Sequence, residues 1–287
     1  MSQTSGTPRK QHPYLPNSQD IELVSDDVPR GGFRSVLFDF DGTISLIREG
    51  WRGIMIPLMV EILAALKTGE SEEQLEGIVA DFVDRLTGKQ TIYQAIQLCE
   101  EIKTRGGSPE DPLVYKQRYH DRLLQHIDKR LQGLRSGSID PGDLMVPGSI
   151  DLLENLANQG LTLYLASGTD VDYVLEEARL LGVTTFFPDR IFGALDSYEN
   201  FSKAMVIQDI IKTHSLKGEE LLGFGDGYVE IENVKEVGGT AVGVATDEAN
   251  RKGVDAWKRE RLIGAGADLI IPEYREQETL VAYLCNA

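Results

Sequence analysis

The chain has 287 residues, 41% of them hydrophobic, which is enough to bury one large domain or a core with a smaller second domain. Its formal net charge of −17 argues against a surface that gathers nucleic-acid phosphates, so we expect no nucleic-acid partner. Its two cysteines, Cys99 and Cys285, are too few for a disulfide framework and form no Cys-x-x-Cys pair, which suits a reducing cytoplasm.

Residues 1–32 predict a flexible or loosely packed N-terminal arm. They lack periodicity, contain four prolines and end in an Arg-Gly-Gly sequence. Their first twenty residues are polar and lack the charged-then-apolar pattern of an export signal. The most apolar stretch of the chain, Trp51–Leu66, contains two charged residues and is too short to span a bilayer. We therefore expect neither export nor a membrane partner.

A first strand is predicted over Val36–Phe40, where the chain runs into the sequence DFDGT. Because alternate residues of a strand share a face, Asp39 and Asp41 point toward one spot just beyond its carboxyl end. Two carboxylates held this close repel each other unless one takes up a proton or a cation lies between them. A hard divalent ion such as Mg²⁺ suits oxygen ligands of this kind. This turn is where we expect the chemistry.

The same aspartates could instead begin a calcium-binding loop. Such a loop needs oxygen ligands at its first, third and fifth positions, glycine at the sixth and glutamate at the twelfth. Counted from Asp39, those last three positions hold Thr43, Ile44 and Gly50. The calcium-loop interpretation is therefore excluded.

Residues 47–145 contain no convincing strand and predict an inserted helical domain. Glycine-marked breaks separate four amphipathic stretches, at Arg52–Lys67, Glu72–Leu86, Thr91–Arg105 and Pro112–Leu134. An insertion directly after the strand that carries Asp39 lies over the catalytic edge of a sheet. We therefore expect this domain to act as a lid.

The rest of the chain alternates short apolar runs with helical patterns. Five further strands are predicted at Leu161–Ala166, Ile191–Phe192, Leu221–Phe224, Ala241–Val244 and Leu269–Ile271. The intervening helices are predicted at Ser149–Gln159, Val171–Leu181, Ser202–Thr213 and Val229–Val237. This alternation predicts an α/β protein with a doubly wound, Rossmann-like parallel sheet, whose core comprises residues 33–46 and 146–287.

Ligands of open α/β sheets bind beyond the carboxyl ends of the strands, so the residues after each apolar run are candidates for the site. Ser167 follows the second strand within the sequence ASGT, and Asp226 follows the fourth strand within GDGYVE. Lys203 stands at the start of a predicted helix. Together with Asp39 and Asp41, these side chains form a chemically coherent set.

In chain order, these four segments resemble the four motifs of the haloacid dehalogenase superfamily, and the resemblance covers the chain from Phe33 to Pro272. The helical segment 47–145 is similar in content and insertion point to the caps of phosphoglycolate phosphatases and β-phosphoglucomutase. The resemblance therefore implies a phosphoryl-transfer enzyme with a helical cap. Individual cap residues do not transfer from the family to this chain.

The resemblance implies a role for each acidic residue. Asp39 would attack phosphorus and form an aspartyl phosphate, which divides one hard displacement into two easier ones. Asp41 would protonate the departing oxygen and later accept a proton from water. The family's Mg²⁺ would be held by the Asp39 carboxylate, the Asp41 carbonyl, Asp226, a phosphate oxygen and waters. Glu230 stands where the family usually has aspartate, and its greater length favours a supporting role over a direct metal bond.

The remaining motif residues would bind phosphate. By resemblance, Ser167 and nearby backbone N–H groups such as that of Gly168 bind a phosphoryl oxygen. Lys203 places a positive charge between the nucleophile and the phosphate. Thr43 supports the turn and is a candidate phosphate contact.

Simpler interpretations exist for each of these positions. The two aspartates could be a solvated turn, Ser167 a helix cap, and Lys203 a surface lysine. A dinucleotide fingerprint at Gly223–Gly227 would need glycine at the position of Tyr228, and Ser167 lacks the G-x-S-x-G elbow of serine hydrolases. None of the four histidines lies near a predicted strand end, which disfavours a zinc site.

The acid at position 41 separates the reaction classes of the superfamily. Dehalogenases and phosphonatases lack it, so its presence points to a phosphomonoesterase that acts on a small phosphorylated metabolite. The alternative is a sugar-phosphate mutase, which uses the same core but must keep water from the aspartyl phosphate. Whether water is excluded depends on the cap, so the cap distinguishes the phosphatase from the mutase. A third possibility is a catalytically idle binding protein that kept the fold.

Substrate contacts are expected from cap residues near the cleft. The first linker provides Arg48, Glu49, Trp51 and Arg52, and a glycine-marked turn provides Lys89, Gln90, Thr91 and Tyr93. Either arginine could pair with a second anionic group or be a solvated charge, and Trp51 could instead be buried in the cap. The polar and aromatic character of these segments, together with the cap type, favours a phosphorylated sugar or polyol as substrate. The sequence does not indicate an oligomeric state.

Overall fold

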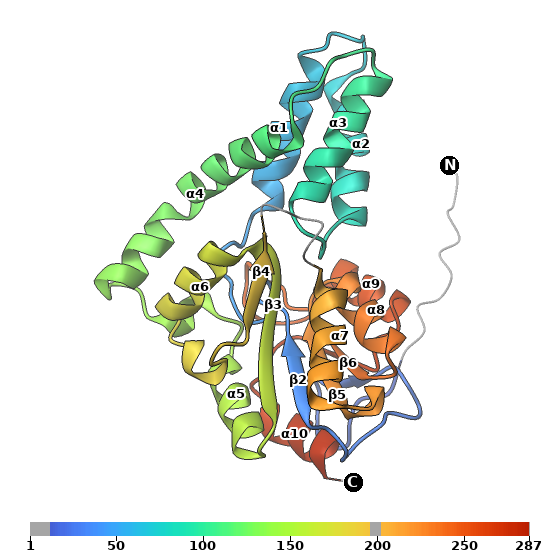
Figure 1. Cartoon of the computed structure of the whole chain (residues 1–287), viewed down its shortest axis with the longest axis vertical. Coiled ribbons are helices and arrows are strands. Elements are labelled where there is room, and N and C mark those ends of the chain that lie inside the picture. Colours follow the sequence, from blue (N-terminus) through green and yellow to red (C-terminus); the bar gives the residue numbers. More distant parts are fainter. Residues whose placement is uncertain (1–11, 196–201, 287) are drawn as a thin grey trace.

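The computed structural model describes residues 12–195 and 202–286. In this part of the chain, a seven-stranded sheet runs in the order β1-β7-β6-β5-β2-β3-β4 (Figure 1). The strands are β1 Glu22–Leu23, β2 Ser35–Phe38, β3 Thr162–Asp170, β4 Ile191–Ala194, β5 Leu221–Gly225, β6 Thr240–Val244 and β7 Leu269–Ile271. The strands from β2 to β7 pair in parallel, and β1 pairs antiparallel with β7. The predicted doubly wound α/β fold is confirmed.

Strand β2 lies inside the sheet, where Val36 pairs with Leu163 of β3 on one side and Leu222 of β5 on the other. Its side chains alternate between the two faces, and all four of its residues are buried. Helices cover both faces: α5 Ser149–Asn158, α6 Val171–Leu180, α7 Lys203–His214, α8 Tyr228–Glu236, α9 Ala256–Gly264 and α10 Gln277–Cys285. Short 3-10 helices lie at Pro141–Leu144, Thr184–Phe186 and Gly218–Glu220.

Two buried clusters correspond to the two faces of the sheet. Val36 and Phe38 share one cluster with apolar residues of α5, α6 and α10. Leu37 belongs to the other, together with apolar residues of α7, α8 and α9. Since β2 is packed from both sides, the turn that follows it is held firmly in place.

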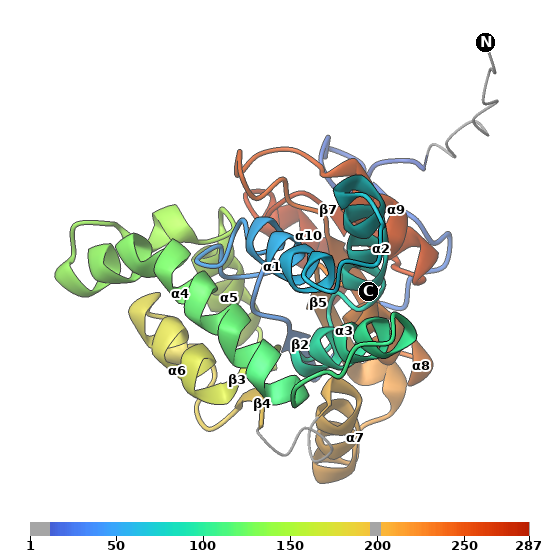
Figure 2. The ribbon, with the colours of Figure 1, turned by 90° about the horizontal axis from the view of Figure 1, so that it is seen from above.

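A helical cap stands over the carboxyl edge of the sheet (Figures 1 and 2). Its helices are α1 Arg52–Ala64, α2 Glu72–Arg85, α3 Ile92–Thr104 and α4 Pro112–Ser136. Ser71 begins α2 with a capping box, and Asp111 caps α4 ahead of a proline at the first helical position. Gly137 ends α4 in the left-handed conformation, with φ of 72°. The four predicted helices are present, with ends that differ by a few residues.

The predicted N-terminal arm is partly ordered. Leu15, Ile21 and Val28 are buried, and Glu22 of β1 pairs with Ile270 at the edge of the sheet. The expectation of a flexible arm is therefore wrong for residues 12–32, because three widely spaced apolar side chains anchor a segment that shows no period in the sequence. Residues 1–11 lie outside the described part of the chain. Within the described ranges, no helix has the length and apolar character needed to cross a bilayer.

Candidate active site

The candidate site lies where the carboxyl ends of β2, β3 and β5 meet the cap. Strand β2 leads into Asp39 and Asp41, β3 carries Ser167, and β5 leads into Asp226. These four residues and Lys203, the first residue of α7, all line one cavity of about 100 Å³. The structure thus brings together side chains that are up to 187 positions apart, between Asp39 and Asp226, because neighbouring parallel strands share an edge.

A buried ion pair joins Asp39 to Lys203. The Lys203 Nζ donates to Asp39 Oδ1 at 2.7 Å, and both side chains are nearly inaccessible to solvent. Burial raises the pKa of Asp39 to about 7, the charge of Lys203 opposes that rise, and the charges of Asp226 and Asp41 add to it. An aspartate in this environment carries an unfavourable negative charge that a further cation would stabilise.

Glu230 lies on the far side of Lys203. Its Oε1 accepts a hydrogen bond from the Lys203 Nζ, and its Oε2 is buried with no hydrogen-bond partner among the described residues. Glu230 does not line the cavity. In this arrangement the glutamate holds the lysine that contacts Asp39.

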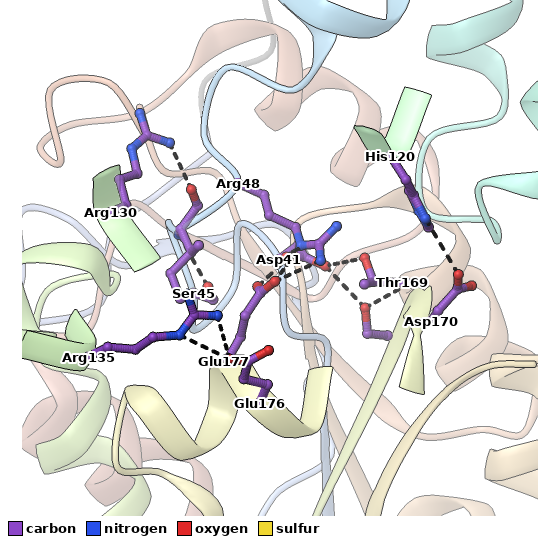
Figure 3. A network of polar contacts seen from close by, with 12 residues as sticks. Asp41, Ser45, Arg48, His120, Arg130, Arg135, Thr169, Asp170, Glu176 and Glu177 are labelled. Carbon is purple, nitrogen blue, oxygen red and sulfur yellow. Dashed lines mark hydrogen bonds and ion pairs between the residues drawn. The ribbon is translucent and has the colours of Figure 1, made fainter. Parts of the chain in front are cut away.

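The Asp41 carboxylate is held by hydroxyl groups of β3 (Figure 3). Its Oδ2 accepts hydrogen bonds from the Ser167 hydroxyl at 3.1 Å and from the Thr169 hydroxyl at 2.9 Å. Between Ala166 and Asp170 the register of β3 against β4 shifts. This irregularity lies beside the site, where such departures from regular pairing re-aim side chains.

Arg48 and Glu177 form a second buried ion pair next to Asp41. The guanidinium donates from Nη2 to Glu177 Oε1 at 2.7 Å, and from Nε to both carboxylate oxygens at 3.1 Å. Burial raises the pKa of Glu177, and the charge of Arg48 opposes that rise. Arg48 is predicted from the sequence as a substrate contact, but in the structure its charge is already matched by the carboxylates of Glu177 and Asp41.

Asp226 is bonded to a lysine that sequence reasoning missed. The Lys258 Nζ, from the first turn of α9, donates to Asp226 Oδ2 at 2.7 Å and also to Glu248 Oε1. A Cβ atom at Gly42, where φ is +74°, would overlap with the Asp226 carboxylate. Glycine at this position therefore allows Asp226 to pack against the turn that follows Asp41.

The cavity contains oxygen atoms that could hold a metal ion. In the described residues, no group of three or more His, Cys, Asp or Glu side chains is arranged to hold a metal ion. The donor set that fits is smaller, since Asp39 and Asp226 both line the cavity and the backbone next to Gly42 packs against Asp226. Two carboxylates and a backbone carbonyl are hard oxygen donors, which match a cation such as Mg²⁺.

The predicted cap contacts divide into two groups. Arg48, Glu49, Trp51, Lys89 and Thr91 line the cavity. Arg52, Gln90 and Tyr93 do not, and Thr43, a predicted phosphate contact, does not line it either. Arg52 is used elsewhere, because it pairs with Asp84 at 2.5 Å and lies over the Trp257 ring. Thr43 is fully buried, and its carbonyl accepts a hydrogen bond from Tyr274.

The cap loop at residues 87–91 touches the core at Gly168, in the segment that is predicted to bind phosphate. A Cβ atom at Gly168 would lie 2.8 Å from the Lys89 carbonyl oxygen, so a side chain there would force the cap away. On α8, the Tyr228 hydroxyl donates to the Arg85 carbonyl at 2.7 Å. The cap segment at residues 85–89 is therefore in contact with the core at both β3 and α8.

Sequence reasoning missed other residues of the cavity wall: Ser45, Met55, Thr87, Gln94, Tyr119, Thr169 and Glu248. Two of these had a usable signal. Thr169 belongs to the segment after the second predicted strand, and Glu248 follows the strand predicted at Ala241–Val244, so both lie at the functional edge of the sheet. Ser45 lies in the turn that follows Asp41, and the other four depend on how the cap folds over that edge.

Gln94, on α3, has an incompletely satisfied side chain. It is 3% exposed, and its Nε2 donates to the Leu86 carbonyl at 3.1 Å. Since that carbonyl can only accept, the bond fixes the orientation of the amide. The Oε1 then remains without a hydrogen-bond partner within the described part of the chain. A buried acceptor beside a cavity is suited to a hydroxyl or amine of a ligand.

The fold and the site define a capped, doubly wound α/β protein with an acidic cavity at the carboxyl edge of its sheet. The family model for haloacid dehalogenase-like hydrolases matches residues 33–238, so the chain belongs to this family. The matched residues include Asp39, Ser167, Lys203 and Asp226 and end before Glu248. No curated protein matches the chain.

Solved structures show the same fold at low sequence identity. A predicted phosphatase from Clostridium acetobutylicum is 17% identical, with a TM-score of 0.57, and the match covers 88% of this chain and 99% of that one. A predicted phosphoglycolate phosphatase from Haemophilus somnus is 15% identical, with a TM-score of 0.56 and coverage of 87% and 98%. A β-phosphoglucomutase from Clostridium difficile is 15% identical, with a TM-score of 0.52 and coverage of 80% and 97%.

Proposed function

We propose that the protein is a Mg²⁺-dependent phosphomonoester hydrolase that acts through an aspartyl phosphate. The observation that carries this proposal is the placement of Lys203 against Asp39 in a cavity that Asp41, Ser167 and Asp226 also line. A nucleophilic carboxylate, an acid two residues later and a buried cation are what phosphoryl transfer to a side chain requires.

Each residue has a defined step. A carboxylate oxygen of Asp39 attacks phosphorus, the bond to the leaving oxygen breaks, and Asp41 gives that oxygen its proton. Water then attacks the phosphorus of the aspartyl phosphate while Asp41 takes the proton back, which releases inorganic phosphate and restores Asp39. The Lys203 ammonium offsets the charge of the phosphoryl oxygens, and the Ser167 hydroxyl turns from Asp41 to the phosphate.

Asp39, Asp226 and the Asp41 carbonyl would hold Mg²⁺. When bound, the ion supplies a positive charge that lets a phosphate dianion approach an anionic nucleophile. The raised pKa of Asp39 supports this assignment, because burial first, and then the charges of Asp226 and Asp41, disfavour its carboxylate form more than Lys203 stabilises it, and a bound cation would offset that cost.

The cavity supports a small, hydroxylated leaving group such as a sugar or polyol. Its volume of about 100 Å³ leaves little room beyond the phosphate, and its cap side carries Trp51, Thr91 and Gln94. The unpartnered Oε1 of Gln94 is an acceptor for a hydroxyl. Lys89, which is exposed, has no ion pair among the described residues and could meet a second anionic group.

The experiment is phosphate release from a panel of small phosphomonoesters, with and without Mg²⁺, with Asp39→Asn as the blank. Metal-dependent release that the variant lacks is the expected result, with the fastest turnover on sugar or polyol phosphates. Isomerisation of a sugar phosphate without net release would instead identify a mutase. Mg²⁺ binding with neither reaction would identify a binding protein, and turnover restricted to nucleotides or phosphopeptides would overturn the substrate class.

A further inference from the structure

The Arg48–Glu177 pair lies at a position that the motif residues do not explain. Arg48 is 6% exposed and Glu177 is 2% exposed, and two nitrogens of the guanidinium contact the carboxylate. Glu177 belongs to α6 in the core, whereas Arg48 belongs to the linker that leads into the cap. A buried ion pair contributes little net stability over an apolar pair, so its position next to a reactive group points to another role.

The two oxygens of Asp41 have different surroundings (Figure 3). Oδ2 accepts from Ser167 and Thr169. Oδ1 is buried and has no hydrogen-bond partner in the described ranges, and the Arg48 Nε lies 3.7 Å from it. The guanidinium is therefore the cation that faces the second oxygen.

Substrate binding changes the contacts of the Asp41 carboxylate. In the proposed function the Ser167 hydroxyl turns to a phosphoryl oxygen, so Asp41 loses one of its two hydrogen bonds at Oδ2. Thr169 and Arg48 are then the side chains left to hold the carboxylate. Glu177 keeps the guanidinium in place through this change, because its two oxygens accept from Nε and Nη2.

From this geometry we infer that Arg48, anchored by Glu177, is a positioning residue that aims Asp41 at the leaving oxygen. This inference rests on the proposed hydrolase function. As Asp41 passes its proton to the leaving oxygen it becomes a carboxylate, and the negative charge that develops faces the Arg48 guanidinium. The pair thus serves the acid step, and Arg48 does not bind a second anionic group of the substrate.

The test compares two leaving groups. An alkyl phosphate needs proton donation to its departing oxygen, whereas p-nitrophenyl phosphate releases an anion that is stable without it. The quantity measured is kcat/KM, because it reports the steps up to formation of the aspartyl phosphate and excludes its hydrolysis. The variants are Arg48→Met and Glu177→Gln.

The matched control is Glu176→Gln. Glu176 is the next residue on α6 and pairs with Arg135 at the surface, so its substitution alters a neighbouring ion pair without reaching Asp41. We expect Arg48→Met to lower kcat/KM more for the alkyl phosphate than for the aryl phosphate. The loss for the alkyl phosphate should be about 10-fold greater, because general acid catalysis contributes effects of this size or more. Glu177→Gln should also lower kcat/KM more for the alkyl phosphate than for the aryl phosphate. Glu176→Gln should leave the ratio of the two kcat/KM values unchanged.

Three results would contradict the inference. Equal losses on both substrates would assign Arg48 to phosphate binding or to structure, and unchanged kcat/KM on both would remove it from the reaction. A ratio that changes as much in Glu176→Gln would also refute it. If Arg48→Met does not fold, as judged by circular dichroism, the near-isosteric Glu177→Gln decides. Failure of the proposed function has a different signature, since wild-type protein would then release no phosphate from either ester.

Discussion

The core edge and the cap form the two sides of one cavity, but they are built differently. On the core side, Asp39, Ser167 and Asp226 stand at the ends of parallel strands, and each is bonded to another side chain. On the cap side, Lys89 is exposed and Gln94 keeps a free acceptor. The difference indicates that the core is organised before substrate arrives, whereas the cap leaves groups that a leaving group would satisfy.

The largest expected effect comes from removing the buried cation of the core. Lys203→Met leaves Asp39 and Glu230 buried without their partner, so it should abolish phosphate release and lower the free energy of unfolding by about 3–5 kcal/mol. Phosphate assays and urea denaturation measure the two effects.

The matched substitution on the cap side is Lys89→Met. Because Lys89 is exposed and has no ion pair in the described residues, its loss should leave the unfolding free energy within about 0.5 kcal/mol and act on KM alone. If the two lysine variants changed stability equally, the contrast between the core and the cap would not hold.

The second effect concerns the hydroxyl acceptor of the cap. Gln94→Met should reduce the preference for glycerol phosphate over propyl phosphate by about 10-fold, because the buried Oε1 of Gln94 accepts from one of the two hydroxyls that propyl phosphate lacks. The measurement is the ratio of kcat/KM values for the two esters. Gln97→Met, on the same helix but bonded to Glu101, is the control. An unchanged ratio in Gln94→Met would show that this amide does not contact the substrate.

The third prediction concerns pH and the contact between α4 and the core. Burial lowers the pKa of His120 to about 4, although the nearby Asp170 opposes this shift. The unfolded chain therefore binds a proton near the ordinary histidine pKa while the folded chain does not, so stability is complete above about pH 6.5 and falls as the pH drops toward 4.

His120→Gln should remove part of this acid sensitivity. Thermal unfolding between pH 4 and 7, in the wild type and in this variant, checks the prediction, with His126→Gln on the exposed side of the same helix as control. A wild-type melting temperature that rises between pH 6.5 and 4 would contradict it.

The smallest effect is expected at the contact between cap and core on α8. Tyr228→Phe removes one exposed hydrogen bond to the Arg85 carbonyl, which is worth about 0.5–1.5 kcal/mol. KM should rise by about 2- to 10-fold, because a cap that is held less tightly closes less often. Steady-state kinetics on the preferred ester measures this change, and a decrease in KM would show that the contact opposes closure.

Much of the core could be predicted because its pattern is local. The alternation of apolar runs and helical segments indicated the doubly wound sheet, and Asp39, Ser167 and Asp226 were predicted as site residues because each comes at the end of an apolar run. Lys203 was found from its place at the start of a helix, with the resemblance adding its role.

The cap side could not be predicted in the same way. Whether Arg48 or Arg52 reaches the cavity depends on which carboxylate each one meets, and those partners, Glu177 and Asp84, are distant in the sequence. In the sequence, nothing distinguishes Gln94 from any other polar residue within a helix. The N-terminal segment was misjudged for a related reason, since Leu15 and Ile21 are buried by contacts that carry no period.

The proposed mechanism is tested most directly by detection of a phosphoryl group on Asp39. The protein is mixed with its preferred phosphoester and Mg²⁺, quenched in acid during turnover, digested and examined by mass spectrometry. One phosphoryl group is expected on the peptide that contains Asp39, lost on treatment with hydroxylamine and absent from Asp39→Asn. Phosphate release at full rate from Asp39→Asn, or a phosphoryl group on another residue, would contradict it.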